Sequence, residues 1–255
     1  MPEAMLSAKN LQRSFYGVRA LNGAGLHVRS GTITGLIGPN GAGKTTVFNA
    51  LSGVIPAESG EIRFDGTDIT HWRPEQISRR GLVRTFQIAR GFRRLTVLET
   101  LLLHGDAQEG EDVMTALFSP SRWRGREREL VNRAEDVAAQ LNLTQVLDNM
   151  SSDLSGGQKK LLEIGRALMG QPKLILLDEP VAGVNPALAA DIAERILALR
   201  DRGLTFLIVE HDMDIVAQLC DPVIVMAAGV RLTEGTFDEI VADDRVQDAY
   251  LGQRT

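Results

Sequence analysis

The segment at residues 38–45, GPNGAGKT, constrains the fold more than any other part of the chain. It fits the pattern G-x-x-x-x-G-K-[ST] without a mismatch. An apolar run at residues 33–37 precedes it, and a stretch with helical character at residues 46–51 follows it. Glycines let the backbone turn its N–H groups inward around an anion, and the positive end of a helix binds the same anion. The sequence therefore predicts a strand, a phosphate-binding loop and a helix in an α/β fold.

Lys44 and Thr45 indicate which ligand this loop takes. The Lys44 ammonium group can reach the β- and γ-phosphates of a nucleoside triphosphate, and the Thr45 hydroxyl group is placed to bind Mg²⁺. The alternative is a glycine-rich turn with an incidental lysine, and the flanking strand and helix argue against it. The nucleotide-binding residues expected in this segment are Gly38, Pro39, Asn40, Gly41, Ala42, Gly43, Lys44, Thr45 and Thr46.

A second apolar run, at residues 174–177, ends in Asp178 and Glu179. Such a run is typical of a strand buried on both faces of a parallel sheet, and ligands bind where these strands leave the sheet. We expect Asp178 to hold Mg²⁺ through water, and Glu179 to polarise the water that attacks the γ-phosphate. Two acids can also merely end a strand. The phosphate-binding loop elsewhere in the chain favours the catalytic interpretation.

A third segment contains Ser155, Gly156, Gly157 and Gln158 and opens a stretch with apolar residues at helical spacing over residues 161–168. A serine and two glycines at a helix start expose backbone N–H groups to an anion, as the phosphate-binding loop does. The alternative is a simple helix cap. The neighbouring Leu154 and Gln158, and the spacing of 20 residues from Ser155 to Ile175 in the acidic strand, favour a second surface that contacts the triphosphate.

These three segments together resemble the ATP-binding cassette ATPases. Residues 38–45, 154–158 and 174–179 correspond to the three hallmark motifs of that family, and the resemblance extends over residues 6–252. The resemblance implies an enzyme that binds ATP and Mg²⁺ and hydrolyses ATP to drive a transporter.

The resemblance also assigns three single residues. Gln87 resembles the family glutamine that reaches the metal and the attacking water, and His211 resembles the histidine that contacts the γ-phosphate. Tyr16 resembles the aromatic residue that stacks on adenine. Phe15 alternates to the opposite face if this segment is a strand, which suits the core better.

One position departs from the broad family pattern, because Asn185 stands where an aspartate is common. Its segment, residues 182–186, nevertheless resembles the ATPases of branched-chain amino acid importers, as do residues 84–87, 210–213 and 249–252. Asparagine keeps the hydrogen-bonding shape of aspartate without its charge. The alternatives are a cassette ATPase for another cargo, such as lipopolysaccharide export or other amide or amino-acid import, and a cassette ATPase outside transport that acts on nucleic acid or ribosomes.

The organisation predicted for the chain is one ATPase domain at residues 5–252. Short strands over residues 5–30 and a strand at 60–65 are expected to form an antiparallel β layer beside the parallel sheet of a P-loop core. Residues 88–168 carry mostly helical signals and are expected to form an inserted α-helical subdomain. Because this insertion separates the phosphate-binding loop from Ser155, two chains placed head to tail would complete each other's ATP sites.

Composition sets the remaining expectations. The net charge of −5 gives no general attraction for nucleic acid, and no apolar run approaches the roughly 20 residues that span a bilayer. Cys220 is the only cysteine, which suits a reducing compartment. Together with these observations, the family resemblance implies a peripheral subunit on the cytoplasmic face of a membrane. The partners that the resemblance implies are permease subunits, a second ATPase subunit and, indirectly, an external substrate-binding protein.

Overall fold

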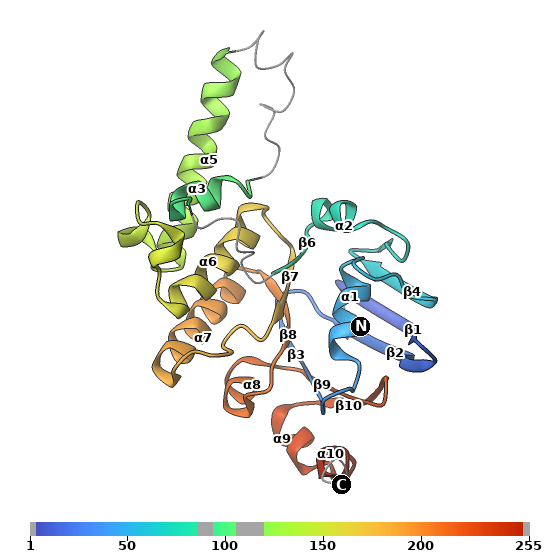
Figure 1. The fold of residues 1–255 in the computed structure, drawn as a ribbon. Helices are drawn as coiled ribbons and strands as arrows, with labels where there is room; N and C mark the ends of the chain where they lie inside the picture. The colour runs from blue at the N-terminus through green and yellow to red at the C-terminus, as the bar shows by residue number, and fades with distance from the viewer. Residues whose placement is uncertain (1–3, 86–93, 106–119, 252–255) are drawn as a thin grey trace.

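The computed structural model describes residues 4–85, 94–105 and 120–251, without the side chains of residues 120–124 and 126. Two β-sheets form the centre, helices cover one of them on the side away from the other, and a helical part extends from one end (Figure 1). Gln87 and parts of the predicted helical segment lie outside the described residues.

The larger sheet has six strands in the order β10-β9-β3-β8-β7-β6. All neighbouring pairs are parallel except β9 and β10, which form an antiparallel hairpin at one edge. The strands are β3 (Ile33–Ile37), β6 (Leu82–Arg84), β7 (Leu174–Asp178), β8 (Thr205–Val209), β9 (Val223–Ala227) and β10 (Val230–Gly235). The parallel sheet predicted from the apolar runs is confirmed, with an added antiparallel edge strand.

Successive residues of the central strands pack into two different cores. Ile175 and Leu177 of β7 join the core formed with helices α3, α5, α6, α7 and α8. Leu174 and Leu176 join the core formed with α1 and the smaller sheet. Strands buried on both faces explain why these runs contain hardly any polar residue.

The smaller sheet is antiparallel, with the strand order β2-β1-β4-β5. The strands are β1 (Leu6–Phe15), β2 (Val18–Val28), β4 (Ser59–Phe64) and β5 (Thr67–Asp68). The expectation of several short strands over residues 5–30 was wrong, because this segment forms one hairpin with strands of 10 and 11 residues. Irregular register within the hairpin interrupts the apolar alternation, which made long strands look short.

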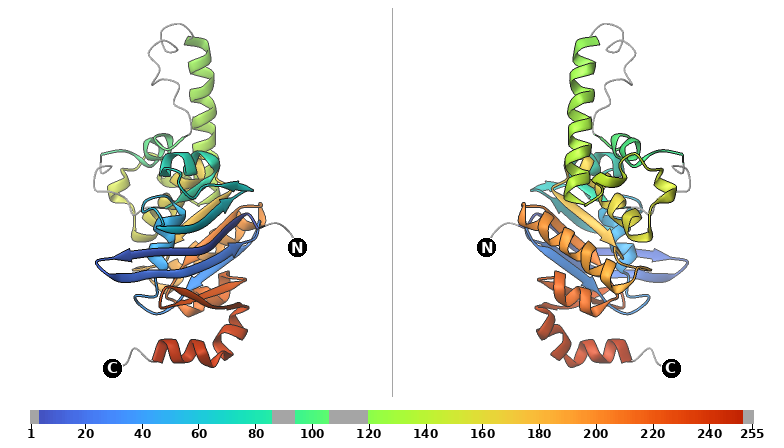
Figure 2. Two further views of the ribbon diagram at one scale, coloured as in Figure 1. Left: turned by 90° about the vertical axis from the view of Figure 1, so that its right-hand side faces the viewer. Right: turned by 90° about the vertical axis from the view of Figure 1, so that its left-hand side faces the viewer.

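The helical part joins the core between β6 and β7. It contains α3 (Val97–Leu102), α5 (Pro120–Gln140), the 3-10 turns Thr144–Val146 and Ser151–Asp153, and α6 (Gly156–Met169). The far end of α5 projects away from both sheets (Figure 2), while Ala134, Val137 and Ala138 near its other end are buried. The predicted class, an α/β P-loop core with an antiparallel β layer and an inserted helical part, is confirmed.

The remaining helices surround the larger sheet and its ends. They are α1 (Lys44–Leu51), α2 (Pro74–Arg80), α7 (Pro186–Asp201), α8 (Met213–Leu219), α9 (Phe237–Ala242) and α10 (Asp244–Leu251). Helix α1 lies between the two sheets, and α7 and α8 cover the opposite face of the larger sheet (Figure 1). The loops that leave β3, β7 and β8 at their carboxyl ends therefore meet at one edge.

Candidate active site

The phosphate-binding loop connects β3 directly to α1, and a side chain at two of its glycines would collide with neighbouring backbone. Gly38 and Gly43 have φ angles of 147° and 100°. A Cβ atom would lie 2.1 Å from the Met226 carbonyl oxygen at Gly38 and 2.6 Å from the Ala20 carbonyl oxygen at Gly43. Neighbouring backbone therefore fixes the path of the loop as tightly as its own conformation does.

Lys44 is the first residue of α1, and its side chain lies back along the loop. The residue is only 6% exposed, and its ammonium group donates hydrogen bonds to the carbonyl oxygens of Gly38 (2.5 Å) and Pro39 (3.0 Å). Burial lowers the pKa of Lys44, while the nearby carboxylates of Glu179 and Asp178 act in the opposite direction. The loop thus holds a buried cation beside two acids. Its hydrogen bonds to the loop carbonyl groups can be exchanged for hydrogen bonds to a bound anion.

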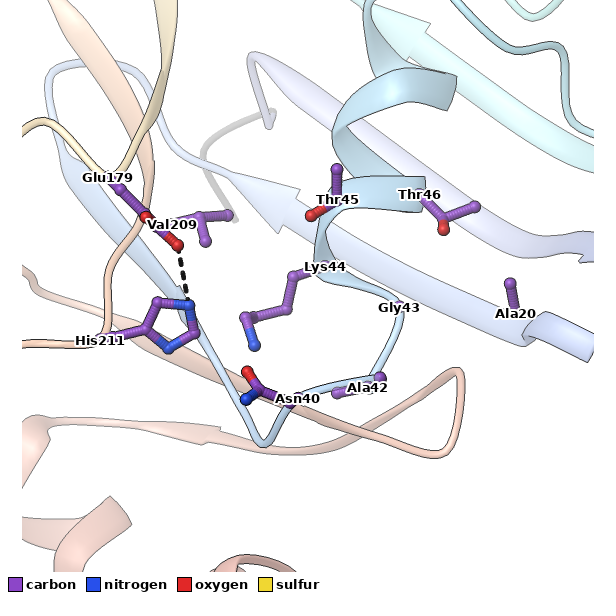
Figure 3. A pocket seen from close by; sticks show the side chains of 11 residues that line it. Ala20, Asn40, Ala42, Gly43, Lys44, Thr45, Thr46, Glu179, Val209 and His211 are labelled. Carbon is purple, nitrogen blue, oxygen red and sulfur yellow. Dashed lines mark ion pairs between the residues drawn. The ribbon is translucent and has the colours of Figure 1, made fainter. Parts of the chain in front are cut away.

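Glu179 and His211 face each other from the ends of two neighbouring strands. His211 Nε2 lies 3.0 Å from Glu179 Oε1, as the dashed line in Figure 3 shows. The backbone of Glu179 has a φ of 50°, which is uncommon for a residue with a side chain. Its N–H group donates to Val209 O at 2.9 Å, and its carbonyl oxygen accepts from Lys160 Nζ at 3.1 Å. These contacts hold the unusual backbone conformation that directs the carboxylate at the histidine.

A cavity of about 340 Å³ brings the loop and this pair together (Figure 3). Glu179 and His211 close it on the side opposite α1. Its lining residues are Ala20, Asn40, Gly41, Ala42, Gly43, Lys44, Thr45, Thr46, Glu179, Val209 and His211. Residues that are distant in sequence and were predicted to handle phosphate thus share one space.

Asp178 lies next to this cavity at the end of β7. Its carboxylate forms an ion pair with Arg84, at 2.9 Å between Oδ2 and Nη2. No group of three or more His, Cys, Asp or Glu side chains is arranged to hold a metal within the described part of the chain. The Asp178 carboxylate and the Thr45 hydroxyl group are nevertheless oxygen donors of the kind that Mg²⁺ prefers, together with phosphate and water oxygens.

Helix α6 begins with Gly156, Gly157 and Gln158, and Ser155 directly precedes it. Ser155 is the N-cap, with its hydroxyl oxygen accepting from the Gln158 N–H at 3.3 Å and its own N–H donating to Gln158 Oε1 at 2.9 Å. Ser155 and Gly156 are exposed, whereas Gly157 is buried against Leu188 of α7. None of these four residues belongs to the described lining of the loop cavity.

Tyr16 is fully exposed at the turn between β1 and β2, and Phe15 is half-buried beneath the Arg13 guanidinium group. Asn185 is the N-cap of α7, where its side-chain oxygen accepts from the Leu188 N–H at 3.0 Å. An aspartate would fill the same role with a charge, so the asparagine preserves the local hydrogen bond.

Several residues around the site were not singled out from the sequence. Arg84 pairs with Asp178, and Lys160 holds the Glu179 carbonyl group. Glu210 is 3% exposed and accepts hydrogen bonds from the N–H groups of Val181 (3.2 Å) and His211 (2.9 Å). A charged residue directly after a buried strand was the available signal for Glu210, because a buried carboxylate needs backbone donors.

Comparison with models of known protein families shows which family this chain belongs to. A model described as ABC transporter matches residues 21–182, more than half of the chain. The chain belongs to the ABC transporter family. As a member of this family it is an ATPase that binds ATP. A second model, described as branched-chain amino acid ATP-binding cassette transporter, matches residues 231–254.

Individual relatives cover almost the whole chain. It is 44% identical, over 97% of its length and 95% of the relative, to a probable branched-chain amino acid transport ATP-binding protein of Archaeoglobus fulgidus. A high-affinity branched-chain amino acid transport ATP-binding protein of Pseudomonas aeruginosa is 37% identical over 99% and 100%. A lipopolysaccharide export system ATP-binding protein of Escherichia coli is 38% identical over 98% of each chain.

The fold agrees with solved cassettes. A nucleotide-free ATP-binding cassette from an ABC transporter superposes with a TM-score of 0.86 at 39% identity, over 98% of this chain and 100% of that one. The ADP conformation of an ABC transporter cassette gives the same values.

Among the residues that the structure describes, no helix combines the length and apolar character needed to cross a bilayer.

Proposed function

We propose that this ATPase energises the import of branched-chain amino acids. The support is the agreement between three features: the model matching residues 231–254, the names of the relatives in Archaeoglobus fulgidus and Pseudomonas aeruginosa, and the subfamily resemblance around Asn185. Lipopolysaccharide export is the rival cargo, because the Escherichia coli export relative is as similar as the Pseudomonas one.

The observation that carries the catalytic proposal is the shared cavity of the loop, Glu179 and His211. Lys44 would transfer its hydrogen bonds from the loop carbonyl groups to the β- and γ-phosphates of ATP. Glu179 would accept a proton from the attacking water, and His211, 3.0 Å away, would orient that carboxylate and contact the γ-phosphate. Gln87 is proposed to orient the same water.

Thr45, Asp178 and Gln87 are proposed to hold Mg²⁺ together with phosphate oxygens. Thr45 lines the cavity and Asp178 lies beside Glu179 at the end of β7, so a hydroxyl and a carboxylate oxygen approach one region from two elements. When bound, the ion would neutralise the charge that develops on the transferred phosphoryl group.

A second ATPase subunit, either an identical chain or a paralogue, is proposed to complete the site head to tail. The exposed residues Ser155 and Gly156, with Gly157 and Gln158, would contact the γ-phosphate bound by the neighbouring subunit. Tyr16 would stack on the adenine held by its own loop. ATP binding would then close the dimer, and hydrolysis would remove the phosphate that holds it closed.

Residues 5–252 are proposed to act as one ATPase domain, in which residues 88–168 form the helical subdomain. Movement of this subdomain during closure would be transmitted to permease subunits in the membrane. The chain would then act from the cytoplasmic face, and an external substrate-binding protein would deliver the amino acid.

Cargo is tested by co-purifying the ATPase with its permease and reconstituting the complex with its substrate-binding protein in liposomes. We expect ATP-dependent uptake of radiolabelled leucine, isoleucine and valine, with no uptake of lysine or glutamate. A complex that hydrolyses ATP, moves none of the three branched amino acids and extracts lipopolysaccharide would overturn the cargo assignment.

The catalytic proposal is tested with Glu179→Gln. This variant should bind ATP with near-normal affinity and accumulate as a closed dimer, because the amide cannot accept the proton from water. Size-exclusion chromatography with and without ATP measures the dimer, and phosphate release measures turnover. Glu194→Gln, at an exposed position of α7, is the charge-matched control. Normal steady-state turnover by Glu179→Gln would remove Glu179 from its role.

A further inference from the structure

Arg84 is a buried cation that joins three elements next to the site. Its side chain is 8% exposed and lies at the end of the edge strand β6. Nη2 donates to Asp178 Oδ2 at 2.9 Å, and Nη1 donates to Asn49 Oδ1 at 2.5 Å. The Phe48 ring covers the guanidinium group, with its centroid 5.6 Å from the guanidinium carbon. One side chain thus connects β6, the end of β7 and helix α1.

Asn49 and Asp178, which accept hydrogen bonds from Arg84, lie on helix α1, which carries Thr45, and at the end of β7. Asn49 follows Thr45 by one helical turn on α1, so the two side chains lie on the same face of that helix. Asp178 lies two residues beyond Leu176, the residue that Arg84 pairs with in the parallel register of β6 and β7. The guanidinium fork therefore spans the gap between the helix that carries Thr45 and the strand that carries Asp178.

We propose that Arg84 is a positioning residue that sets the separation and orientation of Thr45 and Asp178 for Mg²⁺. This inference rests on the proposed function, in which those two residues hold the ion. The guanidinium group donates to Oδ2 of Asp178, so it fixes the carboxylate rotamer. Arg84 is not among the described residues that line the loop cavity.

The chemistry of the site explains why an arginine is used. A planar guanidinium group offers two N–H donors at a fixed angle, so it can hold an amide oxygen and a carboxylate oxygen at a defined distance. A lysine would present one compact ammonium group and could not fix both partners. Asp178 also lies within electrostatic reach of Lys44. Without Arg84, the carboxylate would be free to turn toward Lys44 and away from Thr45.

A positioning role and a purely structural role predict different results. If Arg84 only supports the fold, its removal lowers the melting temperature and weakens ATP binding equally with and without Mg²⁺. If it positions the two metal-binding residues, ATP binding in EDTA is preserved and the additional affinity conferred by Mg²⁺ is lost. The effect of Mg²⁺ on binding therefore separates the two roles.

The experiment compares Arg84→Met, Arg84→Lys and Asn49→Ala in the full chain. ATP affinity is measured by fluorescence titration in EDTA and in Mg²⁺, and turnover is measured across a range of Mg²⁺ concentrations. Arg80→Met is the matched control, because Arg80 is an exposed arginine of α2 whose ion pair with Asp65 is remote from the cavity. Thermal unfolding reports the stability of every variant.

Arg84→Met is expected to bind ATP in EDTA within about twofold of the unmodified chain. The Mg²⁺ concentration for half-maximal turnover should rise at least tenfold, and kcat should fall more than KM changes. Asn49→Ala, which keeps the pair with Asp178 but releases α1, should show the same pattern more weakly, and Arg84→Lys should lie between. If Arg84→Met fails to fold, these two milder variants carry the test.

An unchanged Mg²⁺ dependence in folded Arg84→Met, Arg84→Lys and Asn49→Ala would overturn the proposal, as would equal losses of affinity in EDTA and in Mg²⁺. Asp178→Asn separates this failure from failure of the proposed site. If Asp178→Asn itself responds to Mg²⁺ normally, the metal assignment is wrong. If Asp178→Asn loses the response and the Arg84 variants keep it, only the role of Arg84 is wrong.

Discussion

Two glycine-containing surfaces of the chain are proposed to contact phosphate, and they differ in burial and in the hydrogen bonds that their polar groups make. The loop at residues 38–45 lies in a cavity, where the Lys44 cation is buried and bonded to carbonyl groups of its own loop. The helix start at residues 155–158 is largely exposed, and its capping hydrogen bonds are made among its own residues.

The two surfaces also differ in whether they line the described cavity. The loop has a cavity wall on the opposite side, formed by Glu179 and His211, and we expect one chain to hold a triphosphate there by itself. The start of α6 contributes no residue to the described lining of that cavity. We therefore expect the loop to bind nucleotide in a monomer, and the start of α6 to contact only nucleotide that is bound by a neighbouring subunit.

The largest effect is expected from the buried surface, with Lys44→Ala. Loss of two or three charge-assisted hydrogen bonds to phosphate, each worth about 1.5–3 kcal/mol, should weaken ATP binding on the order of 10²-fold or more. The loop carbonyl groups of Gly38 and Pro39 would also lose their donor. Isothermal titration with the monomer measures the loss, and Lys9→Ala on β1 is the control. Binding within twofold of the unmodified chain would contradict the assignment.

The next largest effect is expected from the exposed surface, with Ser155→Arg. A bulky cation at the N-cap should block contact with a neighbouring nucleotide and lower turnover on the order of 10²-fold, because an electrostatic transition-state contact is worth at least this much. ATP binding to the monomer should stay within twofold, since Ser155 lies outside the loop cavity.

Ser152→Arg is the matched control for this prediction, because Ser152 is an exposed serine just before the same helix. It should keep normal turnover. If Ser155→Arg lost monomer binding as well as turnover, the two surfaces would act within one chain and the contrast between them would fail.

Local sequence patterns predict most of the elements that carry the two surfaces, but not every strand. Strands β3, β7 and β8, the loop and the N-cap Ser155 follow from local patterns, because alternation, glycine spacing and capping residues act over a few positions. For the N-terminal hairpin, the same local patterns predict strands that are too short, because irregular pairing interrupts the alternation of apolar residues. They also do not predict β10 as an antiparallel edge strand.

The supporting residues of the site could not be predicted in this way. Arg84 contacts Asn49 and Asp178, which lie 35 and 94 residues away in the chain. Lys160 contacts the Glu179 carbonyl group across 19 residues and between two elements. Such pairs are set by how the elements pack, and no spacing rule in one sequence relates their positions.

A smaller effect is expected from Tyr16→Ala, which tests whether the monomer also holds the base. Tyr16 is fully exposed on the β1–β2 turn, free to stack on an adenine. Loss of one stacked base should weaken ATP binding roughly tenfold, from about 1–3 kcal/mol per stacked base. Binding of tripolyphosphate, which lacks the base, should not change. Val18→Ala, at an exposed position of β2, is the control, and equal losses for ATP and tripolyphosphate would exclude stacking.

The last prediction concerns stability, not binding or turnover, and compares two adjacent glycines at the start of α6. A Cβ atom at Gly157 would lie 2.2 Å from a Leu188 side-chain carbon, whereas at Gly156 it would meet nothing within 4 Å. Gly157→Ala should therefore be less stable than Gly156→Ala by about 1–3 kcal/mol, because overpacking costs this much while both gain the same helix propensity. Denaturant unfolding measures the difference. Equal stabilities would mean that Leu188 moves aside without cost. Helix α7 would then not hold the start of α6 in one fixed position.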